Sequence, residues 1–129
     1  MVRILEFSSR SKTEFEVLFM ISFVLPVYRS AESLPELHRR LVAEFGGMST
    51  DFELIFVEDC GGDGSWEVIE QLAAQDQRVR GLRMSRNYGQ HNALLCGIRA
   101  AQGEVIVTLD DDLQHRPEEV PKLLEKLED

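Results

Sequence analysis

The sequence of 129 residues is poor in several residue types, and each shortage argues against a class of function. Its two cysteines, Cys60 and Cys96, fit no metal-binding or redox spacing, and they indicate two small, half-buried side chains in a reducing compartment. Lys and Arg total 14 against 23 Asp and Glu. The net charge of −9 argues against a general nucleic-acid binder, because phosphate contacts need clustered cations, but it suits a site for a divalent cation.

Long apolar runs are also missing. The longest, at residues 17–25, is far shorter than the roughly 20 residues that a helix needs to cross a bilayer. A signal peptide is an alternative, because basic residues precede this run, but two glutamates lie directly before it and no A-x-A cleavage site follows. We therefore expect a buried strand here. Residues 1–18 are expected to form a loose leader, and residues 19–129 one domain that is incomplete at its C-terminus.

Apolar runs alternate with helical patterns along the rest of the chain. The patterns predict strands at residues 21–27, 53–57, 81–85 and 104–109, and helices at residues 34–45, 66–73, 90–102 and 117–127. Ser33 and Glu36 have the spacing of a capping box for the first helix. Continuous apolar strands alternating with helices predict an α/β fold, with an open, mainly parallel, Rossmann-like sheet and helices on both faces.

In such a sheet, ligands bind at the carboxyl ends of the strands. The segment VIVTLDDDLQH places three aspartates at the end of the last strand. Asp110 and Asp112 project to the same side of an extended chain, Asp111 projects to the other, and Gln114 can return toward Asp112. Two carboxylates and an amide oxygen suit Mg²⁺ or Mn²⁺, and a bound dication would remove their repulsion and attract a diphosphate. An acidic surface turn is the alternative.

The other strand ends carry further candidates. Asp59 can accept hydrogen bonds from a base or a ribose, or form an Asx turn into the glycine-rich loop that follows. Tyr28 can stack on a base or pack at the strand edge. Arg86 can meet a phosphate or form a surface salt bridge. The loop glycines, Gly61, Gly62 and Gly64, permit positive φ and close ligand approach, yet the loop is neither a G-x-G-x-x-G fingerprint nor a P-loop.

Three segments carry a resemblance to a known family. FVLPVYRSAESLPEL, IFVEDCGGDGSWEVI and SRNYGQHNALLCGIRAAQGEVIVTLDDDLQHRPEEVPKLL follow one another in the order and spacing of family 2 glycosyltransferases with the GT-A fold. The chain resembles the dolichol-phosphate mannosyltransferase-like subgroup, which includes bacterial undecaprenyl-phosphate sugar transferases. The resemblance covers about residues 21–127.

The resemblance implies sugar transfer from a UDP- or GDP-sugar to a polyprenyl phosphate at the cytoplasmic face of a membrane. Mg²⁺ or Mn²⁺ would act as a Lewis acid that offsets charge on the departing nucleoside diphosphate. It implies metal ligation by Asp110, Asp112 and Gln114. Together with the motifs above, it gives the candidate nucleotide-sugar-binding residues as Pro26, Tyr28, Glu32, Asp59, Arg86, Asp110 and Asp111.

The sequence departs from the family pattern in two places. Glu58 stands where the first aspartate of the V-D-D-G-S loop is usual, and Cys60-Gly61 stands where Gly-Ser is common. The chain also ends soon after the D-x-D segment, so we expect the acceptor half and the catalytic base to lie downstream. The chain is then the nucleotide-binding half and does not complete transfer alone.

Other classes of function remain as alternatives. A non-catalytic nucleotide-binding fragment would use the same strand ends. A phosphoacceptor receiver domain has an acidic pair and a later aspartate with about the spacing of Glu58-Asp59 and Asp110, but here the pair follows the second strand, and the required lysine is missing. A phosphohydrolase would carry its D-x-D nearer the N-terminus.

Overall fold

The computed structural model describes residues 3–6, 20–47 and 51–109 of the chain. Within these residues, five strands form one sheet in the order β1-β5-β2-β3-β4. The strands are β1 (Arg3–Glu6), β2 (Met20–Val27), β3 (Asp51–Glu58), β4 (Val79–Arg83) and β5 (Val105–Thr108). The helices are α2 (Leu34–Phe45), α3 (Ser65–Gln75) and α4 (Gln90–Ala100).

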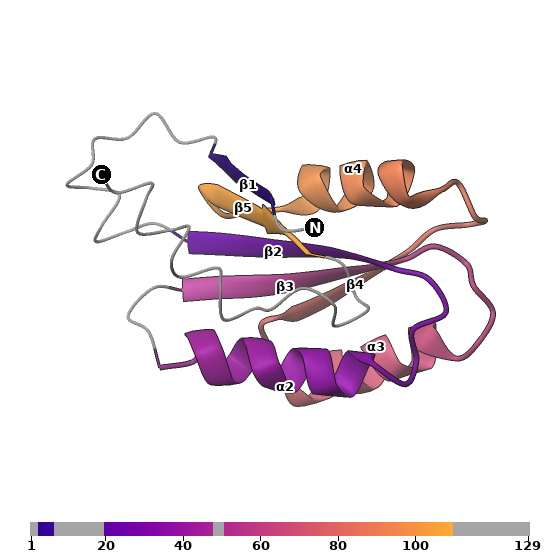
Figure 1. Cartoon of the computed structure of the whole chain (residues 1–129), viewed down its shortest axis with the longest axis horizontal. Coiled ribbons are helices and arrows are strands. Elements are labelled where there is room, and N and C mark those ends of the chain that lie inside the picture. The colour runs from indigo at the N-terminus through magenta and orange to yellow at the C-terminus, as the bar shows by residue number, and fades with distance from the viewer. Residues whose placement is uncertain (1–2, 7–19, 48–50, 110–129) are drawn as a thin grey trace.

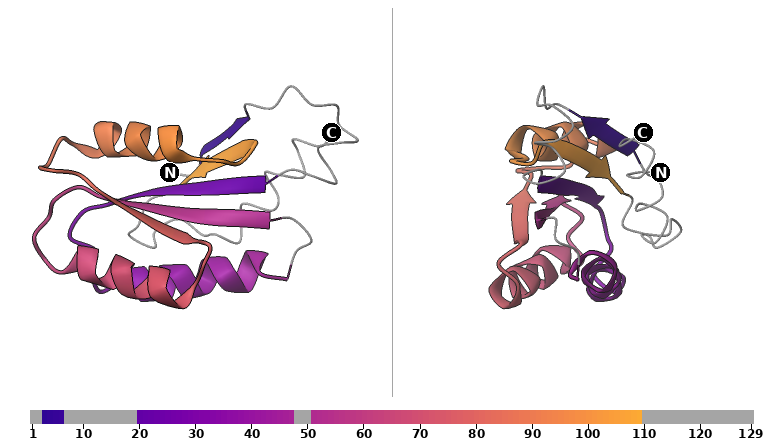
Figure 2. Two further views of the ribbon diagram at one scale, coloured as in Figure 1. Left: turned by 180° about the vertical axis from the view of Figure 1, so that it is seen from behind. Right: turned by 90° about the vertical axis from the view of Figure 1, so that its left-hand side faces the viewer.

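The sheet is parallel from β5 through β2 and β3 to β4, and only β1 runs antiparallel, beside β5. Helices α2 and α3 cover one face, and α4 covers the other (Figures 1 and 2). This arrangement confirms the predicted α/β fold class. The chain proceeds outward from β2 to β3 and β4, then crosses back to place β5 on the other side of β2. Strand order therefore reverses between β2 and β5, which is where open sheets of this kind bind ligands.

Each face of the sheet has its own apolar core. Phe23, Phe45 and Phe52 pack together on the face of α2, with ring centroids 4.7–6.1 Å apart. Val24 and Ile55 belong to the smaller cluster beneath α4. Because both faces are covered, β2 and β3 are apolar along nearly their whole length rather than in alternation.

Two local predictions were wrong. Residues 3–6 lie within the predicted leader, yet they pair with the sheet as β1. The capping box at α2 is absent, because Ser33 makes no side-chain cap hydrogen bond and Glu36 instead pairs with Arg39 and Arg40, one turn further on. The other predicted strands and helices are present with shifted ends. The predicted helix at residues 117–127 lies outside the described residues.

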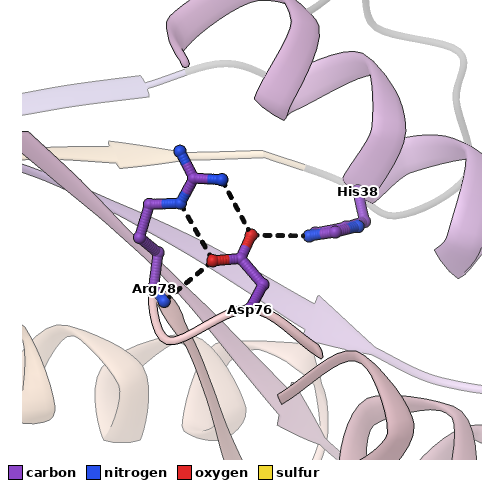
Figure 3. A network of polar contacts seen from close by, with 3 residues as sticks. All are labelled: His38, Asp76 and Arg78. Carbon is purple, nitrogen blue, oxygen red and sulfur yellow. Dashed lines mark hydrogen bonds and ion pairs between the residues drawn. The ribbon is translucent and has the colours of Figure 1, made fainter. Parts of the chain in front are cut away.

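Polar networks hold the amino-terminal edge of the sheet. Glu53 is 3% exposed, and its carboxylate accepts hydrogen bonds from the Ser22 hydroxyl at 2.6 Å and the Arg80 guanidinium at 2.9 Å. A second network ties α2 to the turn after α3, where Asp76 accepts from Arg78 and lies 2.9 Å from the ring of His38 (Figure 3). Both networks are distant from the carboxyl ends of the strands.

Candidate functional site

Three loops meet at the carboxyl edge of the sheet. Residues 28–33 follow β2, residues 59–64 follow β3 and residues 84–89 follow β4, and Figure 1 shows these loops together at the right-hand end of the sheet. All of them carry residues that the sequence singled out. The predicted convergence at one edge is thus present for the described part of the chain.

Pro26 marks the point where β2 parts from β5. Pairing between β2 and β5 ends at Val24, whose carbonyl accepts from the Leu109 N–H at 3.0 Å. Pairing with β3 continues to Val27. Backbone groups alternate sides along a strand, so residue 26 faces the same side as Val24, toward β5, and a proline has no N–H to donate there. Pro26 therefore ends the ladder at the reversal point, where a ligand would enter.

Tyr28 and Glu32 lie on the loop after β2. Tyr28 directly follows the strand and is 45% exposed, with the Arg29 guanidinium 5.2 Å from its ring centroid. Glu32 is exposed in the turn before α2. Tyr28 thus presents an aromatic face to solvent at the sheet edge. The stacking role for Tyr28 stays a prediction.

The glycine-rich loop is held by Glu58. Its carboxylate is buried and accepts from the N–H groups of Cys60 at 2.9 Å and Gly61 at 2.8 Å, and Arg83 lies 3.8 Å away. The sequence analysis considered an Asx turn in which Asp59 bonds to the glycine-rich loop. In the structure, Glu58 makes these bonds instead. Gly62 adopts positive φ as predicted. Gly61 does not, but a Cβ at this position would lie 2.9 Å from the backbone nitrogen of Arg29. Glycine at position 61 therefore allows the two loops to approach each other closely.

Two non-glycine residues at this edge adopt left-handed backbone conformations. Arg29 has φ 52° and Cys60 has φ 59°. The register pairs Val27 with Glu58, so both residues stand two positions beyond the last pair of neighbouring strands. A left-handed conformation costs a non-glycine residue free energy, and such residues concentrate at functional sites. No sequence pattern predicted these two conformations.

Asp59 connects two loops. It is only 4% exposed, and its two carboxylate oxygens accept from the N–H groups of Tyr88 and Gly89, each at 3.1 Å. Its own N–H donates to the Val27 carbonyl at 2.9 Å. Gly89 precedes α4 with φ 94°, so this contact fixes the start of that helix. A carboxylate that accepts two hydrogen bonds keeps lone pairs with which it can accept more.

Asp63 and Ser65 were not assigned a role from the sequence. One Asp63 oxygen accepts from the Ser65 hydroxyl at 2.6 Å, and the other accepts from the Ala31 N–H at 3.3 Å. Partial burial raises the pKa of Asp63, but these hydrogen bonds outweigh it and lower the pKa below its usual value. The D-G-S sequence before a helix could have indicated these local bonds, but not the reach to the loop after β2.

Arginines lie among the carboxylates of this edge. Three exposed arginines each lie over an aromatic ring: Arg29 over Tyr28 at 5.2 Å, Arg83 over Trp66 at 5.6 Å and Arg86 over Tyr88 at 4.8 Å. Arg86, the predicted phosphate contact, is thus exposed on the loop that Asp59 anchors. Guanidinium groups held over rings are well suited to meet phosphate oxygens.

The predicted metal ligands lie outside the described residues. Asp110, Asp112 and Gln114 follow Leu109, the last described residue, as does Asp111. Among the described residues, no group of three or more His, Cys, Asp or Glu side chains could hold a metal ion. Leu109 itself is hydrogen-bonded to β2 beside Pro26, so the acidic segment follows the strand end nearest the reversal point. Carboxylate and amide oxygens there fit Mg²⁺ or Mn²⁺ by their chemistry.

Among the described helices, none is long and apolar enough to cross a membrane. The sequence itself has informative relatives. A relative from Shewanella sediminis, named undecaprenyl-phosphate 4-deoxy-4-formamido-L-arabinose transferase, is 44% identical over 110 residues. The match covers 84% of this chain and 33% of the relative, so the chain spans about a third of that protein's length.

Solved structures share the fold at lower identity. The mannosyltransferase PcManGT from Pyrobaculum calidifontis, in complex with GDP-Man and Mn²⁺, matches with a TM-score of 0.73 and 20% identity over 84% of this chain and 32% of its own. TarS 1-349 from S. aureus, in complex with UDP, matches with a TM-score of 0.68 and 21% identity over 82% of this chain and 31% of its own. The model of the family described as "Glycosyl transferase family 2" matches residues 22–129. The chain therefore belongs to glycosyl transferase family 2.

Proposed function

We propose that this chain binds the nucleotide-sugar donor of a glycosyltransferase that delivers its sugar to undecaprenyl phosphate. The observation that carries the proposal is the convergence of Tyr28, Asp59 and Arg86 at the carboxyl edge beside the strand-order reversal, in a chain of this family. The name of the Shewanella sediminis relative supports 4-deoxy-4-formamido-L-arabinose, or a closely similar sugar, as the group transferred. The receiver-domain alternative gains no support from the family match.

In this proposal the donor lies across the loops after β2, β3 and β4. Tyr28 offers an exposed ring for the base, and the remaining lone pairs of Asp59 accept from the base or the ribose. Glu32 lies on the same loop as Tyr28. Arg86 meets a phosphate of the donor and offsets part of its negative charge.

The residues beyond Leu109 complete the donor site in this proposal. Asp110, Asp112 and Gln114 would hold Mg²⁺ or Mn²⁺, and Asp111 would contact the nucleotide sugar. A metal there would supply Lewis-acid stabilisation of the departing nucleoside diphosphate. Pro26 keeps the pairing of β2 and β5 from continuing into this space. The Mn²⁺ and GDP-Man in PcManGT support a metal-assisted donor site in a protein of the same fold.

The acceptor sets the location of the proposed reaction. Undecaprenyl phosphate is a membrane lipid, so we propose that the protein acts in the cytoplasm, at the cytoplasmic face of a membrane. This chain spans about a third of its relative, and we propose that these residues contribute donor binding. We assign no described residue to the attack of the lipid phosphate on the sugar.

Calorimetric titration of the chain with UDP and GDP, first with Mn²⁺ and then with EDTA, tests the proposal. We expect one nucleotide to bind, and EDTA to weaken its binding. Tyr28→Ala should raise the Kd, since a base stacked on an aromatic ring contributes about 1–3 kcal/mol. Leu95→Ala is the matched control, because Leu95 is 44% exposed, similar to Tyr28 at 45%, but lies on α4. If the folded chain binds neither nucleotide, the proposal is wrong.

A further inference from the structure

Asp63 and Ser65 join the two loops that carry the proposed donor contacts. Ser65 opens α3, and its side chain is 1% exposed. Its hydroxyl donates to Asp63 at 2.6 Å and accepts from the Ser30 N–H at 2.9 Å. Asp63 in turn accepts from the Ala31 N–H at 3.3 Å. Two successive backbone N–H groups of the loop after β2 are thus bound by side chains of another loop and helix.

The bound segment lies between two proposed donor contacts. Ser30 and Ala31 follow Tyr28 and immediately precede Glu32 in sequence. Holding two successive backbone groups fixes the path of the chain on both sides of them. Tyr28 and Glu32 both lie on the loop after β2. Their orientation toward a ligand therefore depends on two side chains from outside that loop.

The loop that this bridge holds also contains a residue with a strained backbone. Arg29 is left-handed at φ 52°, and its side-chain Nε donates to the Gly61 carbonyl at 3.3 Å. A non-glycine residue keeps such a conformation only where the surroundings hold it. The Arg29–Gly61 contact holds the strained residue by its own side chain, and the Asp63–Ser65 bridge holds the two residues that follow it, so the two loops stabilise one another.

We propose that Asp63 and Ser65 are positioning residues for the nucleotide-sugar donor. They keep the loop after β2 in the conformation that presents Tyr28 and Glu32, without contacting the donor themselves. This inference rests on the proposed function, because it needs a donor to position. A loop that occupies its binding-competent conformation for only a fraction of the time weakens affinity by that fraction.

Another buried serine provides a closely matched control. Ser22 is 0% exposed, its hydroxyl donates to Glu53 at 2.6 Å and it accepts from the Gly103 N–H at 2.8 Å, the same pattern as at Ser65. It lies five residues before the end of β2, about 17 Å from the carboxyl edge at 3.3 Å per residue. Ser65→Ala and Ser22→Ala therefore remove equivalent hydrogen bonds at opposite edges of one sheet.

The experiment compares the two variants by urea denaturation and by titration with UDP and GDP in Mn²⁺. We expect a loss of stability that is at least as large for Ser22→Ala, because its partner Glu53 is buried whereas Asp63 is exposed. We also expect a Kd about tenfold higher for Ser65→Ala and an unchanged Kd for Ser22→Ala. If the wild-type chain binds a nucleotide and Ser65→Ala binds it equally well, the inference is overturned and the proposed function stands. If the wild-type chain binds neither nucleotide, the proposed function fails, and the inference fails with it.

A second variant keeps the test decisive if Ser65→Ala does not fold. Asp63 is exposed, so Asp63→Asn preserves the core. Ser65 and Ala31 donate to different carboxylate oxygens of Asp63, and asparagine has an acceptor oxygen at only one of these two positions. We expect a raised Kd and faster amide hydrogen exchange confined to residues 30–31. Unchanged exchange at these residues together with unchanged affinity would overturn the inference.

Discussion

Gly97 allows α4 to lie close against the sheet, and its replacement by alanine sets two opposing effects against each other. A Cβ at this position would lie 2.4 Å from Val24 Cγ1 and 2.9 Å from Val57 Cγ2. Both valines are fully buried and β-branched, so neither side chain can easily change its rotamer to relieve the clash. The clash should cost about 1–3 kcal/mol of stability, as overpacking of a filled core does.

Helix propensity acts in the opposite direction at Gly97. Alanine within a helix is favoured over glycine by about 0.5–1 kcal/mol. Because the clash involves two stiff side chains of central strands, we expect it to exceed the propensity gain, leaving a net loss of about 1–2 kcal/mol. With a slope of about 2 kcal/mol per M, the urea midpoint should fall by about 0.5–1 M.

Urea denaturation followed by circular dichroism measures this change, with Gly47→Ala as the matched control. No atom lies within 4 Å of a Cβ built on Gly47, so alanine there should leave the midpoint equal or slightly higher. Val57→Ala in combination with Gly97→Ala should cost less than the sum of the two single changes, because it removes one clashing methyl. A midpoint for Gly97→Ala at or above the wild-type value would refute this account of the packing.

Three further predictions concern carboxylates. Hydrogen bonds from Arg78, partly opposed by burial, hold the pKa of Asp76 well below its usual range. The contribution of Asp76 to stability is therefore complete above about pH 4 and is lost as the pH falls further. Between pH 7 and pH 2 the urea midpoint should fall less for Asp76→Asn than for wild type, and parallel curves would contradict this. Glu53→Gln should cost about 1.5–3 kcal/mol in the same denaturation assay, the worth of hydrogen bonds to a charged group, and a loss below that range would show that the buried charge is dispensable. Asp59→Asn should speed amide exchange at Tyr88 and weaken nucleotide binding, and exchange at the wild-type rate would show that the link between the loops does not depend on the charge.

The parallel sheet was predictable because β2, β3 and β5 are nearly continuous apolar runs, as strands buried on both faces of a sheet are. The spacing of Leu34, Leu37 and Leu41 likewise placed α2, and all three are buried. β1 was not predictable, since four residues pair with a partner about one hundred positions away and carry no local signal. The capping box failed because arginines one turn away compete for Glu36, and pairing preferences of that kind are decided by geometry.

The sequence predicted which residue types form the site, but not which groups each of them binds. Polar residues after buried strands indicated one edge, and the structure brings the described ones together there. Glu58 and Asp59 are adjacent acids, yet one bonds to its own loop and the other to the backbone of Tyr88 and Gly89. Backbone N–H groups have no sequence signature, so neither partner could be inferred. The same holds for the N–H groups that Asp63 and Ser65 bind.

The pairing of β1 with β5 has a consequence for synthesis on the ribosome. Arg3 is opposite Thr108, so 105 further residues are synthesised after Arg3 before this pair can form. At 5–20 residues per second, the delay is about 5–20 s. β2, β3 and β4 can meanwhile assemble in the order in which they emerge, each beside the last. Among the described strands, β5 is added last, beside β2, and β1 then pairs with the other edge of β5.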